Sequence, residues 1–387
     1  MLTKLLVLQP LDLCNLNCSY CYLPGRRNTK RMPHHILAAS LKLIFNRPFS
    51  EDPRRHEKLK ILWHSGEPLL AGIPFFKTAL KLIQQYNVHH IPVSMEFQTN
   101  ATPITQAWCD FIKENHLNVS VSIDGPEFLH NRYRINWQGK GSFKLVMRGI
   151  HHLQKNNLPL RAICVLTKDS LDYPDEIYDF FTKTGFESVC FNVEEQEGIH
   201  THSTMSLREQ APSSDIRSKY QSFMSIFYDR WARDDFQLHI REFSHIFGNL
   251  LFQKQMGATT GLISAESLAF NILTITKDGD ISTFSPELSG GSKTNPKQFI
   301  IGNVLDITSL DELKMQPNFL SQLHDIKQGV EKCAKECDYF NLCGGGSASN
   351  KFFENSDFNT TETSVCILSK KILTDLIIHK LQENRLP

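Results

Sequence analysis

The chain has 387 residues, of which 41% are hydrophobic and 21% are charged, and its formal net charge at pH 7 is +1. This length allows two domains, or one large barrel with an appendage, in an ordinary globular protein. The near-zero charge gives no bulk attraction to nucleic acid or to a membrane, and no apolar run is long enough to span a bilayer.

The start of the chain and its cysteines indicate the compartment. Met1–Lys4 leads directly into an apolar segment, which leaves no room for a signal peptide, so we expect a cytoplasmic protein. Ten cysteines in such a chain favour metal or redox chemistry over a disulfide framework.

The first half of the chain alternates short apolar segments with amphipathic ones, the pattern of strand–helix units. The expected strands are Leu5–Leu11, Leu59–Trp63, Val93–Gln98, Asn118–Ile123, Leu160–Leu166 and Ser188–Val193. The expected helices are His34–Asn46, Phe75–Tyr86, Thr105–Asn115 with Thr105 as N-cap, Phe143–Gln154, Pro174–Thr184 and Ser214–Ala232. Six such units predict a parallel α/β sheet with right-handed crossovers, curved into a partial, TIM-like (β/α)6 barrel. Functional groups in barrels of this kind collect at the carboxyl ends of the strands.

A loop directly after the first strand holds three cysteines in eight residues, Cys14, Cys18 and Cys21. Three thiolates can bind three irons of a four-iron cluster and leave the fourth iron open to a small molecule. A zinc site is the alternative, but zinc needs a fourth ligand nearby, for which His34 and His35 are the only close candidates. The ligand count favours the cluster. With Tyr20 just before the third cysteine, the loop resembles that of the radical S-adenosylmethionine (SAM) superfamily.

The resemblance implies a 4Fe-4S cluster on this loop and SAM bound beside it. The turn after the second strand resembles the Gly-Gly-Glu-Pro turn that holds the SAM amino group in the family, although the first glycine is replaced by serine here. Polar residues after the fourth strand contact ribose and the methionine carboxylate in the family. The SAM contacts that the resemblance implies are Tyr20, Ser65, Gly66, Glu67, Pro68, Ser122 and Arg134.

Three acids, Glu194, Glu195 and Glu197, follow the sixth strand. Acids inside a barrel mouth are costly unless they bind something, so we expect a role in SAM or peptide binding. The stretch Ile199–Ser214 is expected to be a loop. Further on, the alternation around Asp278-Gly279 predicts a β-hairpin.

The C-terminal third carries Cys333, Cys337, Cys343 and Cys366, a complete set of four thiolates. Zinc could also use four cysteines. Placed downstream of the first loop, however, the set resembles a SPASM domain, the auxiliary-cluster extension of radical SAM peptide maturases. A full SPASM domain has seven cysteines and two clusters. Here the positions after the hairpin and four after Cys343 are not cysteine, so we expect one auxiliary 4Fe-4S cluster. The remaining cysteines, Cys109, Cys164 and Cys190, are expected to be small core residues.

The whole pattern is most similar to the maturases that form three-residue cyclophanes in ribosomal precursor peptides. The resemblance implies a carbon–carbon bond between an aromatic ring and the β-carbon of the residue two positions on. A base must take a ring proton, for which Glu287 and Glu194 are the candidates, and the auxiliary cluster could take the electron. The implied partners are the precursor peptide and an external electron donor such as flavodoxin or ferredoxin.

Two alternatives remain. One is another peptide oxidation, such as thioether formation or formylglycine formation in sulfatases. Against formylglycine formation, sulfatase-maturing enzymes have a Cys-Asp pair where this chain has Ser285-Pro286. The other is a non-catalytic zinc-binding module. The expected domains are a barrel at residues 1–235 and a SPASM-like domain at residues 236–387.

Overall fold

The computed structural model describes residues 3–46, 58–206, 211–256 and 262–383. Its centre is one ten-stranded sheet with the strand order β10-β9-β8-β1-β2-β3-β4-β5-β6-β7. The strands are β1 (Leu5–Leu8), β2 (Leu59–Trp63), β3 (Val93–Thr99), β4 (Asn118–Ser122), β5 (Arg161–Leu166), β6 (Ser188–Val193), β7 (His239–Ile240), β8 (Ile272–Ile275), β9 (Asp280–Thr283) and β10 (Gly302–Asn303).

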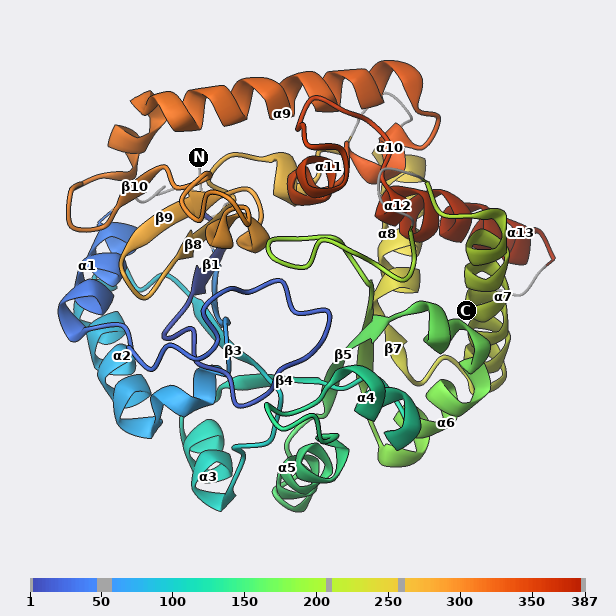
Figure 1. Ribbon diagram of the computed structural model, residues 1–387, viewed down its shortest axis with the longest axis horizontal. Coiled ribbons are helices and arrows are strands. Elements are labelled where there is room, and N and C mark those ends of the chain that lie inside the picture. The colour runs from blue at the N-terminus through green and yellow to red at the C-terminus, as the bar shows by residue number, and fades with distance from the viewer. Residues whose placement is uncertain (1–2, 47–57, 207–210, 257–261, 384–387) are drawn as a thin grey trace.

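Strands β1 to β7 lie in the sheet in their order along the chain, and each runs parallel to the strand before it. Parallel neighbours need crossover connections, and the helices supply them. In Figure 1 these helices form an outer ring around the strands. They are α1 (His34–Phe45), α2 (Ile73–Tyr86), α3 (Gln106–Glu114), α4 (Glu127–Tyr133), α5 (Phe143–Lys155), α6 (Pro174–Thr184) and α7 (Ser214–Arg233). The partial-barrel α/β architecture is confirmed.

The sheet core is aliphatic and aromatic because the parallel strands are covered by helices on their outer side. Trp63, Phe76, Phe97 and Trp108 pack edge to face between β2, β3, α2 and α3. A second aromatic group joins α6, β6 and α7 through Phe181, Phe191 and Phe227. These contacts pack the outer helices against the strands whose carboxyl ends lead into the residues expected to be functional.

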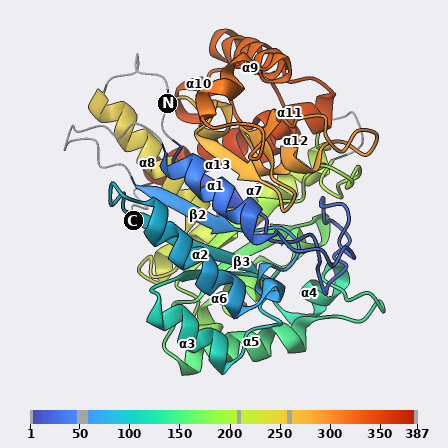
Figure 2. The ribbon, with the colours of Figure 1, turned by 90° about the vertical axis from the view of Figure 1, so that its left-hand side faces the viewer.

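The C-terminal part extends the same sheet. Strand β8 pairs in parallel with β1, with Leu5 opposite Ile272, and β9 returns antiparallel to β8 as the expected hairpin. Helices α8 (Arg241–Met256), α9 (Pro317–Glu336), α10 (Phe340–Cys343), α11 (Ala348–Asn355), α12 (Ser364–Cys366) and α13 (Leu373–Gln382) complete it. Viewed from the side, α9 and α10 lie above the layer formed by α1 and α2 (Figure 2).

The expected elements differ from the structure mainly at their ends. The first strand is shorter than expected and stops at Leu8, before the bend that leads into the cysteine loop. Thr105 occupies the N-cap position of α3, but within the described part of the chain its side chain makes no capping hydrogen bond. The loop expected at residues 199–214 reaches α7 as predicted, except that its residues 207–210 lie outside the described part. Within the described ranges no helix has the length and apolar character needed to cross a bilayer.

Candidate functional site

The loop with Cys14, Cys18 and Cys21 crosses the mouth of the barrel, and its backbone is held there by hydrogen bonds to the segment after α4. The N–H of Asn17 donates to the carbonyl of Ile135 at 2.7 Å, and the indole N–H of Trp137 donates to the carbonyl of Cys14 at 2.8 Å. The hairpin after α4 therefore supports the loop from outside, although the sequence pattern had not singled out that hairpin.

The three thiols of this loop lie in each other's electrostatic field. Burial and the nearby Glu67 carboxylate raise the pKa of Cys14, and Cys18 and Cys21 raise it further. Burial raises the pKa of Cys18 to about 11, although Arg134 acts against it. Thiolates crowded in this way need a cationic partner, and an iron cluster that takes one thiolate per iron supplies one. The donor set therefore fits the cluster.

Glu67 connects the end of β2 to the end of β3 and to the cysteine loop. Its buried carboxylate accepts hydrogen bonds from the Thr99 hydroxyl at 2.7 Å, the Asn100 N–H at 2.7 Å and the Leu69 N–H at 3.1 Å. Its own N–H donates to the carbonyl of Leu13 at 2.8 Å. Burial raises the pKa of Glu67 to about 7, even though these donors favour the charged form.

The residues before Glu67 hold an unusual turn. Ser65 has φ of +91° and Gly66 has φ of +55°. A Cβ at Gly66 would lie 2.4 Å from the carbonyl oxygen of Leu13, so only glycine lets the turn approach the loop. Pro68 then opens a short 3-10 helix with Glu67 as its N-cap.

Arg134 and Asp124 form a buried pair beneath the cysteine loop. The guanidinium donates from Nε and Nη2 to the two carboxylate oxygens of Asp124 at 2.9 and 3.0 Å. The Tyr20 hydroxyl also donates to Asp124. The sequence pattern assigned no role to Asp124, and the structure makes it the common partner of two residues expected to contact SAM. Ser122, another of the residues expected to contact SAM, accepts a hydrogen bond from Gln98 at 2.8 Å.

The acids after β6 separate into two environments. Glu194 points into the following loop, where its carboxylate accepts from the Thr204 N–H at 2.8 Å and lies 3.1 Å from His200 Nε2. Glu195 and Glu197 instead line a cavity of about 690 Å³ together with Glu287. The structure therefore does not bring the two candidate bases together.

The acids of the cavity hold protons strongly. Burial raises the pKa of Glu287 to about 8, and the negative charges of Glu266 and Glu195 contribute. Burial likewise raises the pKa of Glu195 to about 7 and that of Glu197 well above its usual range.

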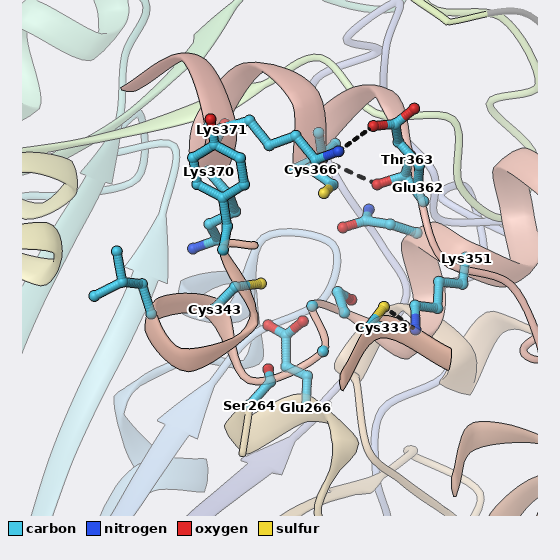
Figure 3. Close-up of a pocket in the computed structure, with 18 of the residues that line it drawn as sticks. Ser264, Glu266, Cys333, Cys343, Lys351, Glu362, Thr363, Cys366, Lys370 and Lys371 are labelled. Atoms are coloured by element: carbon cyan, nitrogen blue, oxygen red, sulfur yellow. Dashed lines mark hydrogen bonds and ion pairs between the residues drawn. The ribbon is translucent and has the colours of Figure 1, made fainter. Parts of the chain in front are cut away.

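The C-terminal cysteines line the same cavity. Figure 3 shows Cys333, Cys343 and Cys366 around one space, with the carboxylate of Glu266 directed toward it. Burial raises the pKa of Cys366 to about 12, and Cys343 and Cys337 add to the effect. In the described part of the chain no three Cys, His, Asp or Glu side chains are arranged as ligands of one metal ion. In a cluster, by contrast, each thiolate binds its own iron, and four thiols around one cavity fit this requirement.

The other three cysteines lie in the barrel wall. Cys109 and Cys164 are fully buried, in α3 and β5, and Cys190 is half-buried in β6. None of them lines the cavity.

The comparisons with known proteins agree with this geometry. The family model described as the radical SAM superfamily matches residues 8–181. An uncharacterised protein of Synechocystis is 39% identical over 99% of this chain and 93% of its own length. The serine-type anaerobic sulfatase-maturating enzyme of Bacteroides thetaiotaomicron is 28% identical, covering 89% of this chain and 82% of the relative.

Two solved structures share the fold. One, described as anSMEcpe with bound AdoMet, has a TM-score of 0.77 and 22% identity and covers 98% of both chains. The other is Streptococcus suis SuiB bound to its precursor peptide SuiA, with a TM-score of 0.63, 15% identity, and coverage of 94% of this chain and 76% of SuiB. The chain belongs to the radical SAM superfamily, and it is an enzyme that uses a 4Fe-4S cluster and SAM.

Proposed function

We propose that the enzyme oxidises a ribosomally made peptide by joining an aromatic ring carbon to the β-carbon of the residue two positions on. Relatives named as sulfatase-maturating enzymes and the SuiB structure with its precursor peptide support a peptide substrate. In an extended peptide, residues i and i+2 share a face, so a three-residue ring is geometrically natural.

The main support for this proposal is the position of the three cavity acids, Glu195, Glu197 and Glu287. The buried phenol of Tyr22, next to Cys21, lies in the field of Glu287, Glu197 and Glu195, and burial with these charges raises its pKa well above the usual value. The N–H of Ile199 also donates to the Tyr22 carbonyl at 3.1 Å. The acids therefore lie between the first cysteine loop and the second thiol set. In the proposed reaction the radical would form beside the first cysteine loop, and the electron would leave toward the second thiol set. An acceptor for the ring proton is therefore needed between these two sites.

One C–H bond at the β-carbon and one at the ring break, and one C–C bond forms, so the product has two hydrogens fewer than the substrate. When bound, the first cluster with SAM supplies the species that removes the β-hydrogen atom, and the auxiliary cluster supplies the acceptor for the remaining electron. Glu287 takes the ring proton. An external one-electron donor supplies the electron for SAM cleavage.

The other residues position the reactants. Cys14, Cys18 and Cys21 would hold the first cluster, and the four C-terminal cysteines would hold a single auxiliary one. The SAM contacts that we propose are Tyr20, Ser65, Gly66, Glu67, Pro68, Ser122 and Arg134. The division between residues 235 and 236 also remains a proposal, since β7 and β8, which both follow it, join the barrel sheet beside β6 and β1.

The test is a reaction of the anaerobically purified enzyme, a reductant and SAM with the precursor peptide encoded by a neighbouring gene. Fragmentation of the product by mass spectrometry should locate the loss of two hydrogens between an aromatic residue and the residue two places on. Glu287→Gln should still cleave SAM but should not form the crosslink, and Glu287→Asp should recover part of it.

Formylglycine formation is the second candidate, favoured by the names of the curated relatives and by the higher TM-score of the anSMEcpe structure. Its product would carry the oxidation on one serine or cysteine with every aromatic ring unsubstituted. That result would reject the crosslink.

A further inference from the structure

A buried lysine lies against the second thiol set. Lys351, on α11, is 3% exposed and is among the residues that line the cavity. Its ammonium donates to the carbonyl of Gly329 at 3.0 Å and to Sγ of Cys333 at 3.4 Å (Figure 3). Nothing in the sequence pattern had singled out this residue.

In the described part of the chain, the ammonium of Lys351 has no carboxylate partner. A buried ammonium is expensive unless an anion lies beside it. Among the described residues, no ion pair joins Lys351 to Asp or Glu, and its hydrogen bonds go to a carbonyl and a thiol. The acids nearby in the cavity are held by the two residues before it, since Ser349 donates to Glu197 and Asn350 to Glu195, each at 3.1 Å. The thiolate of Cys333 is therefore the anion that can pair with the ammonium of Lys351.

Two residues of α9, Gly329 and Cys333, accept hydrogen bonds from the ammonium of Lys351. Gly329 lies one turn before Cys333, so its carbonyl and the thiol face the same side. A Cβ at Gly329 would lie 2.2 Å from the carbonyl oxygen of Phe358 and 3.2 Å from Nζ of Lys351. Glycine at this position lets the backbone of Phe358 and Thr360 pack against α9 and leaves room for Nζ of Lys351.

We propose that Lys351 is a positioning residue that raises the reduction potential of the auxiliary cluster through a charged hydrogen bond to its Cys333 ligand. This inference rests on the auxiliary cluster of the proposed function. Reduction adds negative charge to a cluster, and a buried ammonium beside a ligand sulfur stabilises the reduced form. A higher potential makes the cluster a better acceptor for the electron that leaves the substrate.

The experiment is a redox titration of the full-length holoenzyme without peptide, followed by electron paramagnetic resonance. Added SAM identifies the signal of the first cluster, because three cysteines would leave one of its irons open whereas four would leave none on the auxiliary cluster. Lys351→Met removes the charge and the donor at nearly constant length, and Lys351→Arg retains both. The matched control is Lys332→Met, because Lys332 adjoins Cys333 in sequence but is exposed, so that solvent screens its charge.

The auxiliary cluster of Lys351→Met should have a lower midpoint potential than the wild type, and Lys351→Arg should recover most of the difference. Lys332→Met should leave the potential unchanged. An unchanged potential in Lys351→Met, or an equal drop in Lys332→Met, overturns the proposal. If the Lys351→Met variant does not retain the auxiliary cluster, Lys351→Gln is measured in its place. A midpoint potential equal to that of the wild type in Lys351→Gln would also overturn the proposal.

The measurements distinguish a failure of the proposed peptide reaction from a failure of the role proposed for Lys351. A shifted potential in an enzyme that forms no crosslink would retain the role of Lys351 and reject only the peptide reaction. Iron and sulfide sufficient for just one cluster in the wild type would remove the auxiliary cluster, and with it this inference.

Discussion

Replacing Gly66 by alanine should displace the cysteine loop and remove the first cluster. The new Cβ would lie 2.4 Å from the carbonyl oxygen of Leu13 and 2.5 Å from that of Asp12, whereas ordinary contacts begin at 3.4 Å. The difference, 3.4 minus 2.4, requires a shift of about 1 Å in the backbone directly before Cys14. A shift of this size can cost a reaction roughly 100-fold when it misplaces the reacting groups.

The positive φ of Gly66 adds a second penalty, and a control can separate the two. Alanine at such a φ costs about 1–2 kcal/mol whatever its surroundings. Gly139, at the tip of the hairpin after α4, has φ of +75°, and a Cβ added to it would meet no atom of the described residues within 4 Å. Gly139→Ala therefore carries the backbone penalty without the collision.

The assay measures iron and sulfide per chain and reductive cleavage of SAM. Two four-iron clusters contain about eight irons. The triple variant Cys14→Ala/Cys18→Ala/Cys21→Ala should retain about half of that iron and no SAM cleavage, and Gly66→Ala should approach it. Gly139→Ala should behave as the wild type. Full iron and normal SAM cleavage in Gly66→Ala would refute the argument that this contact positions the loop, and stoichiometric zinc without sulfide in the wild type would refute the enzyme assignment.

Three further predictions follow from the site. Cys366→Ala should lose the auxiliary cluster, whereas Cys109→Ala should keep all of its iron; the iron and sulfide content of both variants checks this. The rate of crosslink formation should rise with pH up to about 8, because Glu287 must lose its proton to act as a base. Glu266→Gln should move that rise to lower pH by removing a neighbouring negative charge, and an unmoved pH profile would exclude Glu287 as the base. Arg134→Met should destabilise the protein by about 3–5 kcal/mol because it leaves the Asp124 carboxylate buried without its partner, and thermal unfolding that is no easier than in the wild type would contradict this.

The sequence alone determined the fold class and the two sets of cysteines. Alternating apolar strands and amphipathic helices are local patterns, and local patterns predict β2, α6 and β6 to the residue. The spacing of Cys14, Cys18 and Cys21 is local in the same sense, because one short loop carries all three.

Tertiary structure alone decided how the side chains at the strand ends are used. The sequence placed Glu194 and Glu287 in one role, yet the chain folds Glu194 toward Thr204 and leaves Glu287 in the cavity. No sequence pattern indicated a role for Lys351. The proposed role depends on its hydrogen bond to Cys333, which forms only when α9 and α11 pack together. Such contacts depend on helix packing rather than on spacing along the chain, and no local pattern encodes which partner a buried charge will meet.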